Sequence, residues 1–408
     1  MAKDVNPPRG MRDFLPVEKL QREQVLARIR STYRLHGFQE VETPALEDLA
    51  KLTSGQGGDN EKLAYRVLKR GAELDEALAT GDPANLADIG LRFDLTVPLT
   101  RYYATNRASL PPVFKAIQTG PVWRAERPQK GRYRQFVQCD IDIIGDATNL
   151  AEIDLLVSSL DALDALGLQD AIIRVNHREL LNRALDSMGI EAADHPLAMI
   201  IVDKLDKLGA DGVVAEMAER MGDKASENLA AWLRQIAGQT AVPAELEPIF
   251  DAVSTRFNAR LRYDPTLVRG MGYYTGPIFE IEHPGSGSSI GGGGRYDGMV
   301  GRWLGTDVPA VGISLGFERV VDLVDAAKFS LQPNTAVLIL ENDAPKTLAN
   351  ALERQRELQE FGTVVRLENR PKKLANLLDE LSKHGFEKFA TVDETTENFE
   401  ALNLREIG

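Results

Sequence analysis

The order of apolar and polar residues predicts that the chain begins with a helix and a strand. Apolar side chains recur at near-helical spacing over residues 17–35, and Gly37 is typical of the position that ends a helix. Residues 38–43 alternate like a strand, which Pro44 closes. Residues 51–89 are polar and contain glycine, so we expect loops there.

The middle of the chain alternates between strand patterns and a long helical stretch. Patterns typical of strands lie at 91–95, 112–119, 122–125, 135–144 and 171–175, and a helix is predicted at 149–166. From 177 to about 260 the sequence is rich in Ala, Leu, Glu and Met, which indicates an inserted helical segment. Strand patterns return at 267–268, 277–282, 288–291 and 311–315, before a helix that begins at Phe317.

The last part of the chain predicts a separate small domain. Residues 328–334 have the composition of a linker. Beyond them, strand patterns alternate with helical patterns, at 336–340, 345–361, 364–367, 372–384 and 389–392. This order predicts an α/β domain with a mainly parallel sheet. The total of 408 residues also favours two or three domains over one.

Composition excludes several classes of protein. A single cysteine, Cys139, rules out an internal disulfide and a zinc site built from several cysteines, and it suits a reducing cytoplasm. No apolar run has the length of a membrane span. We expect no metal held by histidines, because all five are far apart in sequence: His36, His177, His195, His283 and His384.

The net charge of −13 argues against a protein coated in basic surface, but it does not exclude nucleic acid. Binding depends on a local basic patch rather than on the total charge. Residues 127–134 and 370–373 are candidate patches, and each can equally be an ordinary solvated loop.

Residues 267–280 contain the first candidate chemistry. Arg269 precedes Tyr273 and Tyr274, and an apolar run that reads as a strand follows. The planar guanidinium suits phosphate oxygens, and tyrosine hydroxyls can hydrogen-bond a polar ring. Taken alone, the segment favours a simpler interpretation, in which Arg269 is a surface charge and the tyrosines are strand aromatics.

A second candidate is the segment 120–142, which reads as strand, basic loop and strand. Arg124 lies on the first strand, where it can face a ligand. On the second strand, period-two alternation puts Gln138, Asp140 and Asp142 on one face. Such polar groups need a partner if they are buried, and a ligand amine or imidazole would serve. An exposed strand face explains the spacing equally well.

The glycine-rich residues 285–294 do not form a dinucleotide fingerprint, because they lack the strand–GxGxxG–helix context. Their glycines either let the backbone approach a substrate closely or make a hairpin loop.

Several of these segments together resemble a known family. Residues 120–136 resemble motif 2 of the class II aminoacyl-tRNA synthetases, the helix and strand ending at Pro44 resemble motif 1, and residues 308–319 resemble motif 3. Four further segments resemble the histidyl-tRNA synthetase family specifically: 7–13, 127–134, 269–274 and 293–297. The resemblance implies an α+β fold. It places a class II catalytic domain on an antiparallel sheet at 1–325, with a helical insertion at about 177–260, and an α/β anticodon-binding domain at 332–408.

The resemblance also implies roles at a nucleotide site. Arg124 would contact the ATP α-phosphate and the amino-acid carboxylate, and Arg269 would be the second arginine at the α-phosphate. Glu126 would contact the adenine end, and Arg319 would hold the γ-phosphate. Mg²⁺ would bridge the β- and γ-phosphates.

The same resemblance assigns a histidine pocket. Asp94, Thr96 and Gln138 would bind the α-amino group, and Asp142 and Tyr274 would read the two imidazole nitrogens, beside Tyr273. The implied substrates are therefore L-histidine, ATP and histidine tRNA. The implied protein is a cytoplasmic homodimer joined through motif 1. Its anticodon-binding domain would contact tRNA through Arg370, Lys372 or Lys373.

One position departs from the family pattern, which usually has Arg-Gly-Leu-Asp-Tyr-Tyr. Gly272 stands where the aspartate is expected, and we expect this to adjust kinetics rather than abolish function. The resemblance leaves two rivals. One is the regulatory subunit of ATP phosphoribosyltransferase, which generally lacks the C-terminal domain and the full set of arginines. The other is a synthetase-derived binding module without catalysis.

Overall fold

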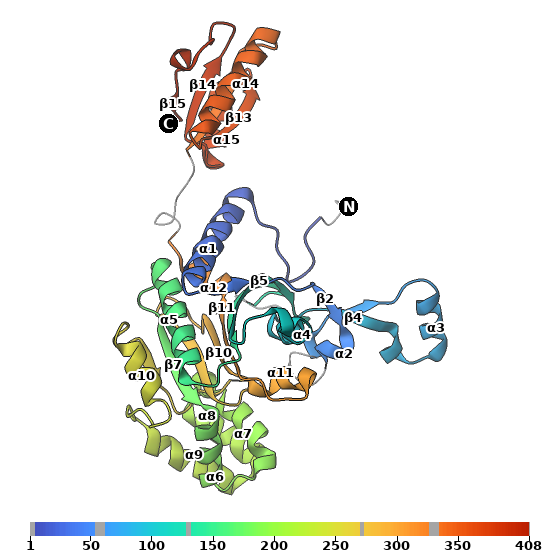
Figure 1. Cartoon of the computed structure of the whole chain (residues 1–408), viewed down its shortest axis with the longest axis vertical. Helices are drawn as coiled ribbons and strands as arrows, with labels where there is room; N and C mark the ends of the chain where they lie inside the picture. Colours follow the sequence, from blue (N-terminus) through green and yellow to red (C-terminus); the bar gives the residue numbers. More distant parts are fainter. Residues whose placement is uncertain (1–4, 54–61, 128–131, 270–272, 326–333, 408) are drawn as a thin grey trace. The chain divides into compact units, whose positions relative to one another are not determined.

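The computed structural model describes residues 5–53, 62–127, 132–269, 273–325 and 334–407. The chain divides into two compact units. The first comprises residues Met1–Asp13 and Val25–Val324, and the second comprises Phe14–Gln24 and Asp325–Gly408. The first unit holds the large sheet and most helices (Figure 1).

An eight-stranded sheet forms the framework of the first unit. Its strand order is β1 (Gln39–Glu40), β5 (Phe114–Trp123), β6 (Gln135–Ile144), β11 (Ala310–Gly316), β10 (Gly291–Arg295), β9 (Pro277–Glu282), β7 (Ile172–His177) and β8 (Leu261–Tyr263). Neighbours are antiparallel except at the two edges, where β1 pairs with β5 and β7 pairs with β8 in parallel. The antiparallel sheet that the sequence predicts for this part of the chain is confirmed.

Helices of the first unit cover this sheet and extend from it. α5 (Asn149–Ala165) packs against β6 and β11, and its core face includes the buried Leu155, Leu156 and Leu160. It begins where the Thr148 hydroxyl accepts a hydrogen bond from the Leu150 amide, as an N-cap does. The same unit contains α4 (Thr96–Asn106), α11 (Asp297–Leu304) and α12 (Phe317–Leu323). The residues of α1 (Pro16–Leu35) are divided between the two units at Val25.

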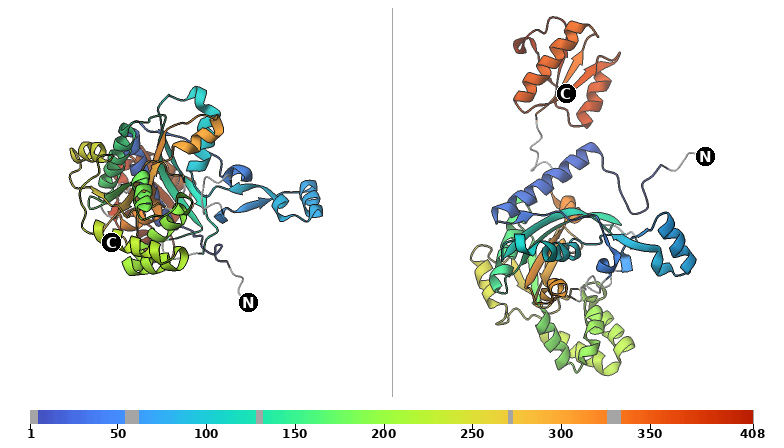
Figure 2. Two further views of the ribbon diagram at one scale, coloured as in Figure 1. Left: turned by 90° about the horizontal axis from the view of Figure 1, so that it is seen from below. Right: turned by 45° about the vertical axis from the view of Figure 1, so that its right-hand side comes forward.

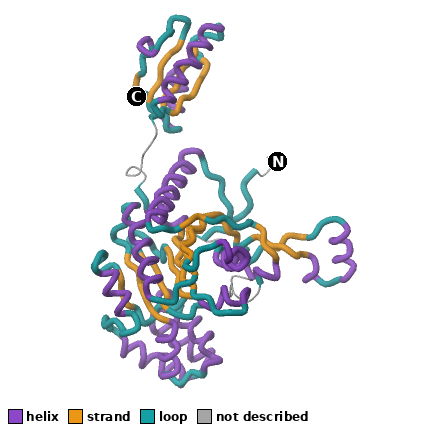
Figure 3. The backbone as a smooth tube through the Cα atoms, in the orientation of Figure 1, coloured by secondary structure: helices purple, strands orange, loops and turns teal. Residues whose placement is uncertain are grey.

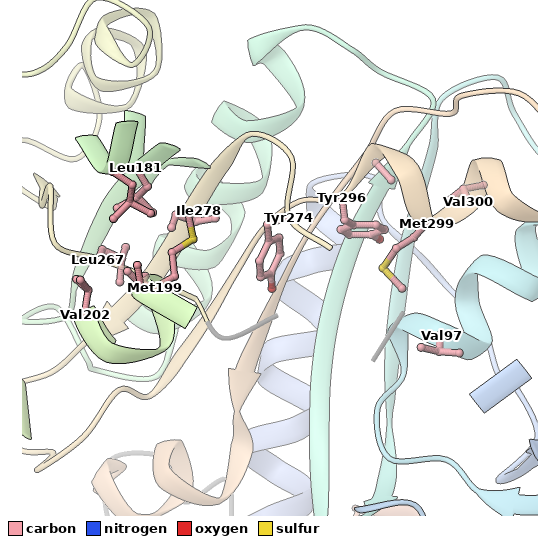
Figure 4. Packing of buried hydrophobic residues seen from close by; sticks show 14 of the residues in the cluster. Val97, Leu181, Met199, Val202, Leu267, Tyr274, Ile278, Tyr296, Met299 and Val300 are labelled. Carbon is pink, nitrogen blue, oxygen red and sulfur yellow. The ribbon is translucent and has the colours of Figure 1, made fainter. Parts of the chain in front are cut away.

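A helical segment joins β7 to β8. It contains α6 (Arg178–Ser187), α7 (His195–Val202), α8 (Leu205–Met221), α9 (Asp223–Ile236) and α10 (Glu247–Ser254). Its apolar residues, among them Leu181, Met199 and Val202, belong to the same core cluster as Leu267 and Ile278 of the sheet region (Figure 4). The segment is thus built into the core of the first unit.

The expectation of loops over 51–89 is wrong. That range contains β3 (Arg66–Leu68), α3 (Ala72–Thr80) and most of β4 (Ala87–Leu91). With β2 (Leu46–Asp48), which precedes α2 (Leu49–Leu52), β3 and β4 form a small antiparallel sheet that extends away from the large sheet (Figure 2). Its strands are too short for a polar-apolar period to be visible. Two predicted strands are also wrong, because residues 92–95 and 267–268 are irregular.

Residues 334–407, which belong to the second unit, form an α/β fold with a mainly parallel sheet, as the pattern of strands and helices predicts. Its sheet has the order β13 (Val364–Asn369), β12 (Thr335–Leu340), β14 (Lys388–Val392) and β15 (Arg405–Glu406), parallel except at β15. The helices α14 (Pro345–Glu360) and α15 (Leu374–Lys383) flank it (Figure 3). Alternate residues of β12 face them: Leu338 packs with Ala351 of α14, and Ile339 packs with Leu381 of α15.

Candidate active site

A cavity of about 690 Å³ lies on the large sheet of the first unit. Strands β6, β9, β10 and β11 contribute to its lining, together with the residues that follow β5 and the start of α12. The cavity brings together every histidine-site and nucleotide-site residue proposed from the sequence, namely Asp94, Thr96, Arg124, Glu126, Gln138, Asp142, Arg269, Tyr273, Tyr274 and Arg319.

Two arginines from distant parts of the chain reach this cavity. Arg124 follows β5, and its Nε donates to the Phe93 carbonyl at 3.0 Å while its guanidinium lies 5.0 Å from the centre of the Phe136 ring. Burial lowers the pKa of Arg124. Arg269 donates from Nη1 to Glu280 Oε2 at 3.1 Å. Burial opposes the charge on Arg269, but Tyr274 and Glu280 outweigh it and its pKa is raised. Both side chains remain cations at neutral pH.

A third arginine and two glutamates mark another end of the cavity. Arg319, on α12, donates from Nη1 to the Ser289 carbonyl. Glu126 lies 3.7 Å from Arg132 Nη1. Glu318 accepts from the Val137 amide at 3.1 Å and forms an ion pair with Arg12, whose guanidinium lies 3.5 Å from the centre of the Tyr133 ring. Sequence reasoning gave Arg12 and Glu318 no role.

A buried carboxylate, that of Asp142, also lines the cavity. Asp142 Oδ1 accepts a 2.5 Å hydrogen bond from the Tyr296 hydroxyl. Its Oδ2 is buried and has no hydrogen-bond partner among the residues that the structure describes. Burial raises the pKa of Asp142 to about 7. An unpaired buried oxygen is costly, so Oδ2 is suited to a ligand donor.

Aromatic rings surround this carboxylate. The Tyr273 ring lies 4.7 Å from that of Tyr274 and 6.1 Å from that of Tyr296, centre to centre. Tyr274 and Tyr296 are both buried in the core cluster (Figure 4). Tyr296 received no role from the sequence. Two signals pointed to it: its place directly after the glycine-rich residues, and its position within the segment 293–297 that resembles the family.

The remaining predicted residues lie nearby and are locally fixed. Asp94 Oδ1 accepts from the Val97 amide at 3.1 Å at the beginning of α4, which Thr96 starts. Gln138 Nε2 donates to Asp140 Oδ2 at 3.4 Å. Burial raises the pKa of Asp140 well above its usual range, and the neighbouring Asp142 adds to this.

Glycines give the cavity a floor without side chains. Residues 291–295 are strand β10, so the predicted strand at 288–291 begins later than expected and most of these glycines are not a hairpin loop. A Cβ on Gly292 would lie 2.7 Å from Arg269 Nη1, and a Cβ on Gly312 would lie 1.9 Å from Asp142 Oδ1. The positions of Arg269 and Asp142 thus depend on glycine beneath them.

Other sequence candidates lie elsewhere. Arg370, Lys372 and Lys373 are exposed in the second unit, between β13 and α15, and Arg370 pairs with Glu341. Gly272 and the basic residues 128–131 fall outside the described residues. Within the described ranges, no group of three or more His, Cys, Asp or Glu side chains is arranged to hold a metal. No helix in those ranges is long and apolar enough to cross a membrane.

Comparisons with known proteins identify the family to which the chain is similar. A family model described as histidyl-tRNA synthetase matches residues 10–320. A histidine–tRNA ligase of Leifsonia xyli is 52% identical, covering 100% of this chain and 99% of that protein. A probable histidine–tRNA ligase of Tropheryma whipplei is 41% identical over 95% of each chain.

Solved structures share the fold. A histidyl-tRNA synthetase from a Nostoc species has a TM-score of 0.73 at 24% identity, covering 99% of this chain and 95% of that one. A structure from Bacillus halodurans, titled as an ATP phosphoribosyltransferase regulatory subunit/histidyl-tRNA synthetase, has the same TM-score at 19% identity, covering 95% and 97%. At these identities the likeness concerns the fold alone. The family match over residues 10–320 and the full-length relative at 52% identity show that the chain belongs to the histidyl-tRNA synthetase family.

Proposed function

We propose that the cavity activates L-histidine with ATP to histidyl-adenylate and pyrophosphate, and that the chain then transfers histidine to the 3′ end of histidine tRNA. One observation carries the proposal: Arg124, Arg269 and Arg319 line the same cavity as the buried carboxylate of Asp142. The cavity thus combines arginines that can bind phosphate with a carboxylate that can bind an imidazole.

The arginines explain how the first step is accelerated. The histidine carboxylate attacks the α-phosphorus, the bond to the pyrophosphate oxygen breaks, and negative charge builds on the α-phosphoryl oxygens. Arg124 and Arg269 stabilise that charge, because fixed cations need no reorganisation during the reaction. Arg319 holds the γ-phosphate, and Glu126 contacts the adenine end.

Selection of histidine follows from paired polar contacts. Asp142 Oδ2 accepts from one imidazole nitrogen, and Tyr274 contacts the other. Tyr296 donates to Oδ1 and so fixes the carboxylate. Asp94, Thr96 and Gln138 bind the α-amino group. A site that leaves such buried groups unpaired rejects amino acids that lack the matching nitrogens.

ATP-dependent enzymes of this kind typically use a divalent metal, and the residues present fit Mg²⁺. Glu318 lines the same cavity as Arg319 and would help to hold the ion, because carboxylate oxygens are ligands that Mg²⁺ prefers. Mg²⁺ held there would supply positive charge that offsets the charge of the leaving pyrophosphate.

Histidine-dependent ATP–pyrophosphate exchange, followed by charging of histidine tRNA, tests this function. We expect both activities from the purified chain. Exchange without charging would leave a histidine-activating protein that is no tRNA ligase. Loss of both, with histidine still bound, would favour the regulatory-subunit alternative.

Gly312 offers a test of the histidine pocket. In a Gly312→Ala variant the new Cβ would collide with Asp142 Oδ1 and displace the carboxylate. We expect the KM for histidine to rise by about tenfold, as a misplacement of about 1 Å can cost more than that. Gly298→Ala is the control, because its Cβ meets nothing within 4 Å. Equal KM values for the two variants would contradict the role of Asp142.

The two units are proposed to divide the work. Residues 1–325 form the catalytic domain, with the helical insertion at about 177–260, and residues 332–408 bind the anticodon. Two exposed lysines, Lys372 and Lys373, make no ion pair with the described residues and suit phosphate contacts.

Replacing both Lys372 and Lys373 with glutamate is expected to weaken tRNA binding and leave pyrophosphate exchange intact. Each reversed charge lowers the number of phosphates that the protein neutralises, so the salt dependence of tRNA binding should fall as well. Lys383→Glu is the control, because Lys383 lies at the other end of α15. An equal loss of exchange and binding would indicate misfolding instead.

The assembly is proposed to be a cytoplasmic homodimer. β1, which follows the motif 1 helix, is an edge strand of the large sheet, and an edge strand can pair with a second chain. Sedimentation of the purified chain distinguishes a dimer from a monomer.

A further inference from the structure

Arg174, on β7, is the centre of a buried ion cluster beside the active site. The residue is 5% exposed. Its guanidinium contacts four carboxylates from three segments of the chain, namely Asp264 at 2.5 Å, Asp206 at 2.7 Å, Glu282 at 3.0 Å and Glu280 at 3.1 Å. Two of these partners lead from Arg174 to Arg269.

The first route runs through Glu280, on β9. One oxygen of Glu280 accepts from Arg174 Nη1 at 3.1 Å, and the other accepts from Arg269 Nη1 at 3.1 Å. Glu280 therefore lies between two cations. Glu280 thus holds the Arg269 guanidinium through one nitrogen, and the five N–H donors of a guanidinium leave capacity for a phosphate as well.

The second route runs through the turn that precedes Arg269. Asp264 accepts from Arg174 Nε at 2.7 Å with one oxygen. Its other oxygen accepts from the Thr266 amide at 2.8 Å and from the Thr266 hydroxyl at 2.7 Å. Asn176, two residues after Arg174, donates to the Leu267 carbonyl at 3.0 Å. Contacts from strand β7 thus fix the backbone of the turn that precedes Arg269.

The third contact reaches the helical segment. Asp206 lies at the start of α8, before a break at Gly209, where φ is 72°. Three residues earlier, Asp203 lines the cavity. Burial raises the pKa of Asp203, and the charge of Arg269 acts in the opposite direction. The segment 203–206 therefore adjoins both Arg174 and the cavity.

We propose that Arg174 is a positioning residue for Arg269, and that Asp206 makes this positioning depend on the placement of the helical segment. The inference rests on the proposed function, because it takes Arg269 as a ligand of the α-phosphate. Arg174 itself does not line the cavity. It acts through Glu280 and through the turn at Asp264.

Arg174→Gln is the main test. The kcat of histidine-dependent pyrophosphate exchange should fall by about 10- to 100-fold, because small misplacements of a reacting group cost that much. The KM for histidine should stay within about twofold, because the arginine acts at the phosphate and not at the imidazole. Arg174→Lys should fall in between, since lysine keeps the charge but cannot bridge the cluster.

Arg262→Gln is the matched control. Arg262 is half-exposed on the neighbouring β8 and pairs with Glu282, so it belongs to the same cluster without contacting Glu280 or Asp264. Its exchange rate should equal that of the wild type. If Arg174→Gln and Arg262→Gln behave alike, the proposal is overturned.

A double variant separates positioning from folding. If Arg174 acts through Arg269, then adding Arg174→Gln to Arg269→Lys should lower kcat by less than about twofold further, because coupled residues are not additive. If the two reductions in kcat multiply instead, Arg174 has a general structural role and the inference is refuted.

Asp206→Asn, at a side chain that is 70% exposed, keeps the test possible if Arg174→Gln does not fold. It should lower kcat in the same direction by a smaller factor, and an unchanged kcat would refute the link to the helical segment. Absence of exchange in the wild type would instead refute the proposed function.

Discussion

Replacing Arg124 with glutamine is expected to lower the rate of histidine-dependent pyrophosphate exchange by about 10²–10³-fold, the usual cost of losing one donor aimed at transition-state charge. Arg124 is held by the Phe93 carbonyl and the Phe136 ring, so its guanidinium is oriented before ATP arrives. Glutamine keeps a donor of reduced reach but removes the charge. Exchange kinetics at saturating ATP and histidine measure the effect.

Arg183→Gln is the control for Arg124→Gln. Arg183 is an exposed arginine on α6 that pairs with Glu245, so removing its charge should leave exchange unchanged. A loss of less than about threefold at Arg124 would contradict its role at the α-phosphate, since a charge-assisted hydrogen bond is worth more than that.

Asp142→Asn is expected to lower kcat/KM for histidine by about 10²–10³-fold, within the range found when one partner of a buried charged pair is removed. The amide can still accept from Tyr296, but it loses the charge that holds the imidazole. Asp140→Asn, two residues earlier on β6, should have a far smaller effect, because Asp140 is given no contact with the imidazole and burial, which raises its pKa, already opposes its charge. An equal loss of kcat/KM in the two variants would contradict the proposal that Asp142, and not Asp140, binds the imidazole.

The pH dependence provides a second readout for Asp142. Burial raises its pKa to about 7, so the carboxyl group is protonated below that pH and ionised above it. Because the ionised form accepts from the imidazole, kcat/KM for histidine should rise as the pH increases through about 7 in the wild type. The imidazole of free histidine itself titrates near pH ~6.5. The Asp142→Asn variant should keep that substrate inflection and lose the one from the enzyme.

Individual strands and helices could be predicted from the sequence where they are long. β6 has the predicted bounds 135–144, because ten residues alternate under a strong apolar signal. The small sheet of β2, β3 and β4 was missed, because three to five residues per strand carry no reliable period. β10 was misplaced, because a strand of glycines has no apolar pattern at all.

The site could be predicted only in part from residue patterns. Period-two alternation grouped Gln138, Asp140 and Asp142, and all three line the cavity. Arg124, Arg269 and Arg319 were brought together by family resemblance, because no local pattern links positions so far apart. The cluster around Arg174 had no sequence signal, since its carboxylates at 206, 264, 280 and 282 are charged residues of ordinary appearance.

The glycine floor limits how this enzyme could be redesigned to load histidine analogues onto tRNA. Protein engineers usually enlarge a pocket by trimming side chains, but Gly292, Gly293 and Gly312 leave nothing to trim beneath the substrate. Space for a bulkier ring has to come from the aromatic walls, at Tyr274 or Tyr296. A smaller residue at 296 would also remove the hydrogen bond that holds Asp142. The wider pocket would therefore bind the imidazole more weakly.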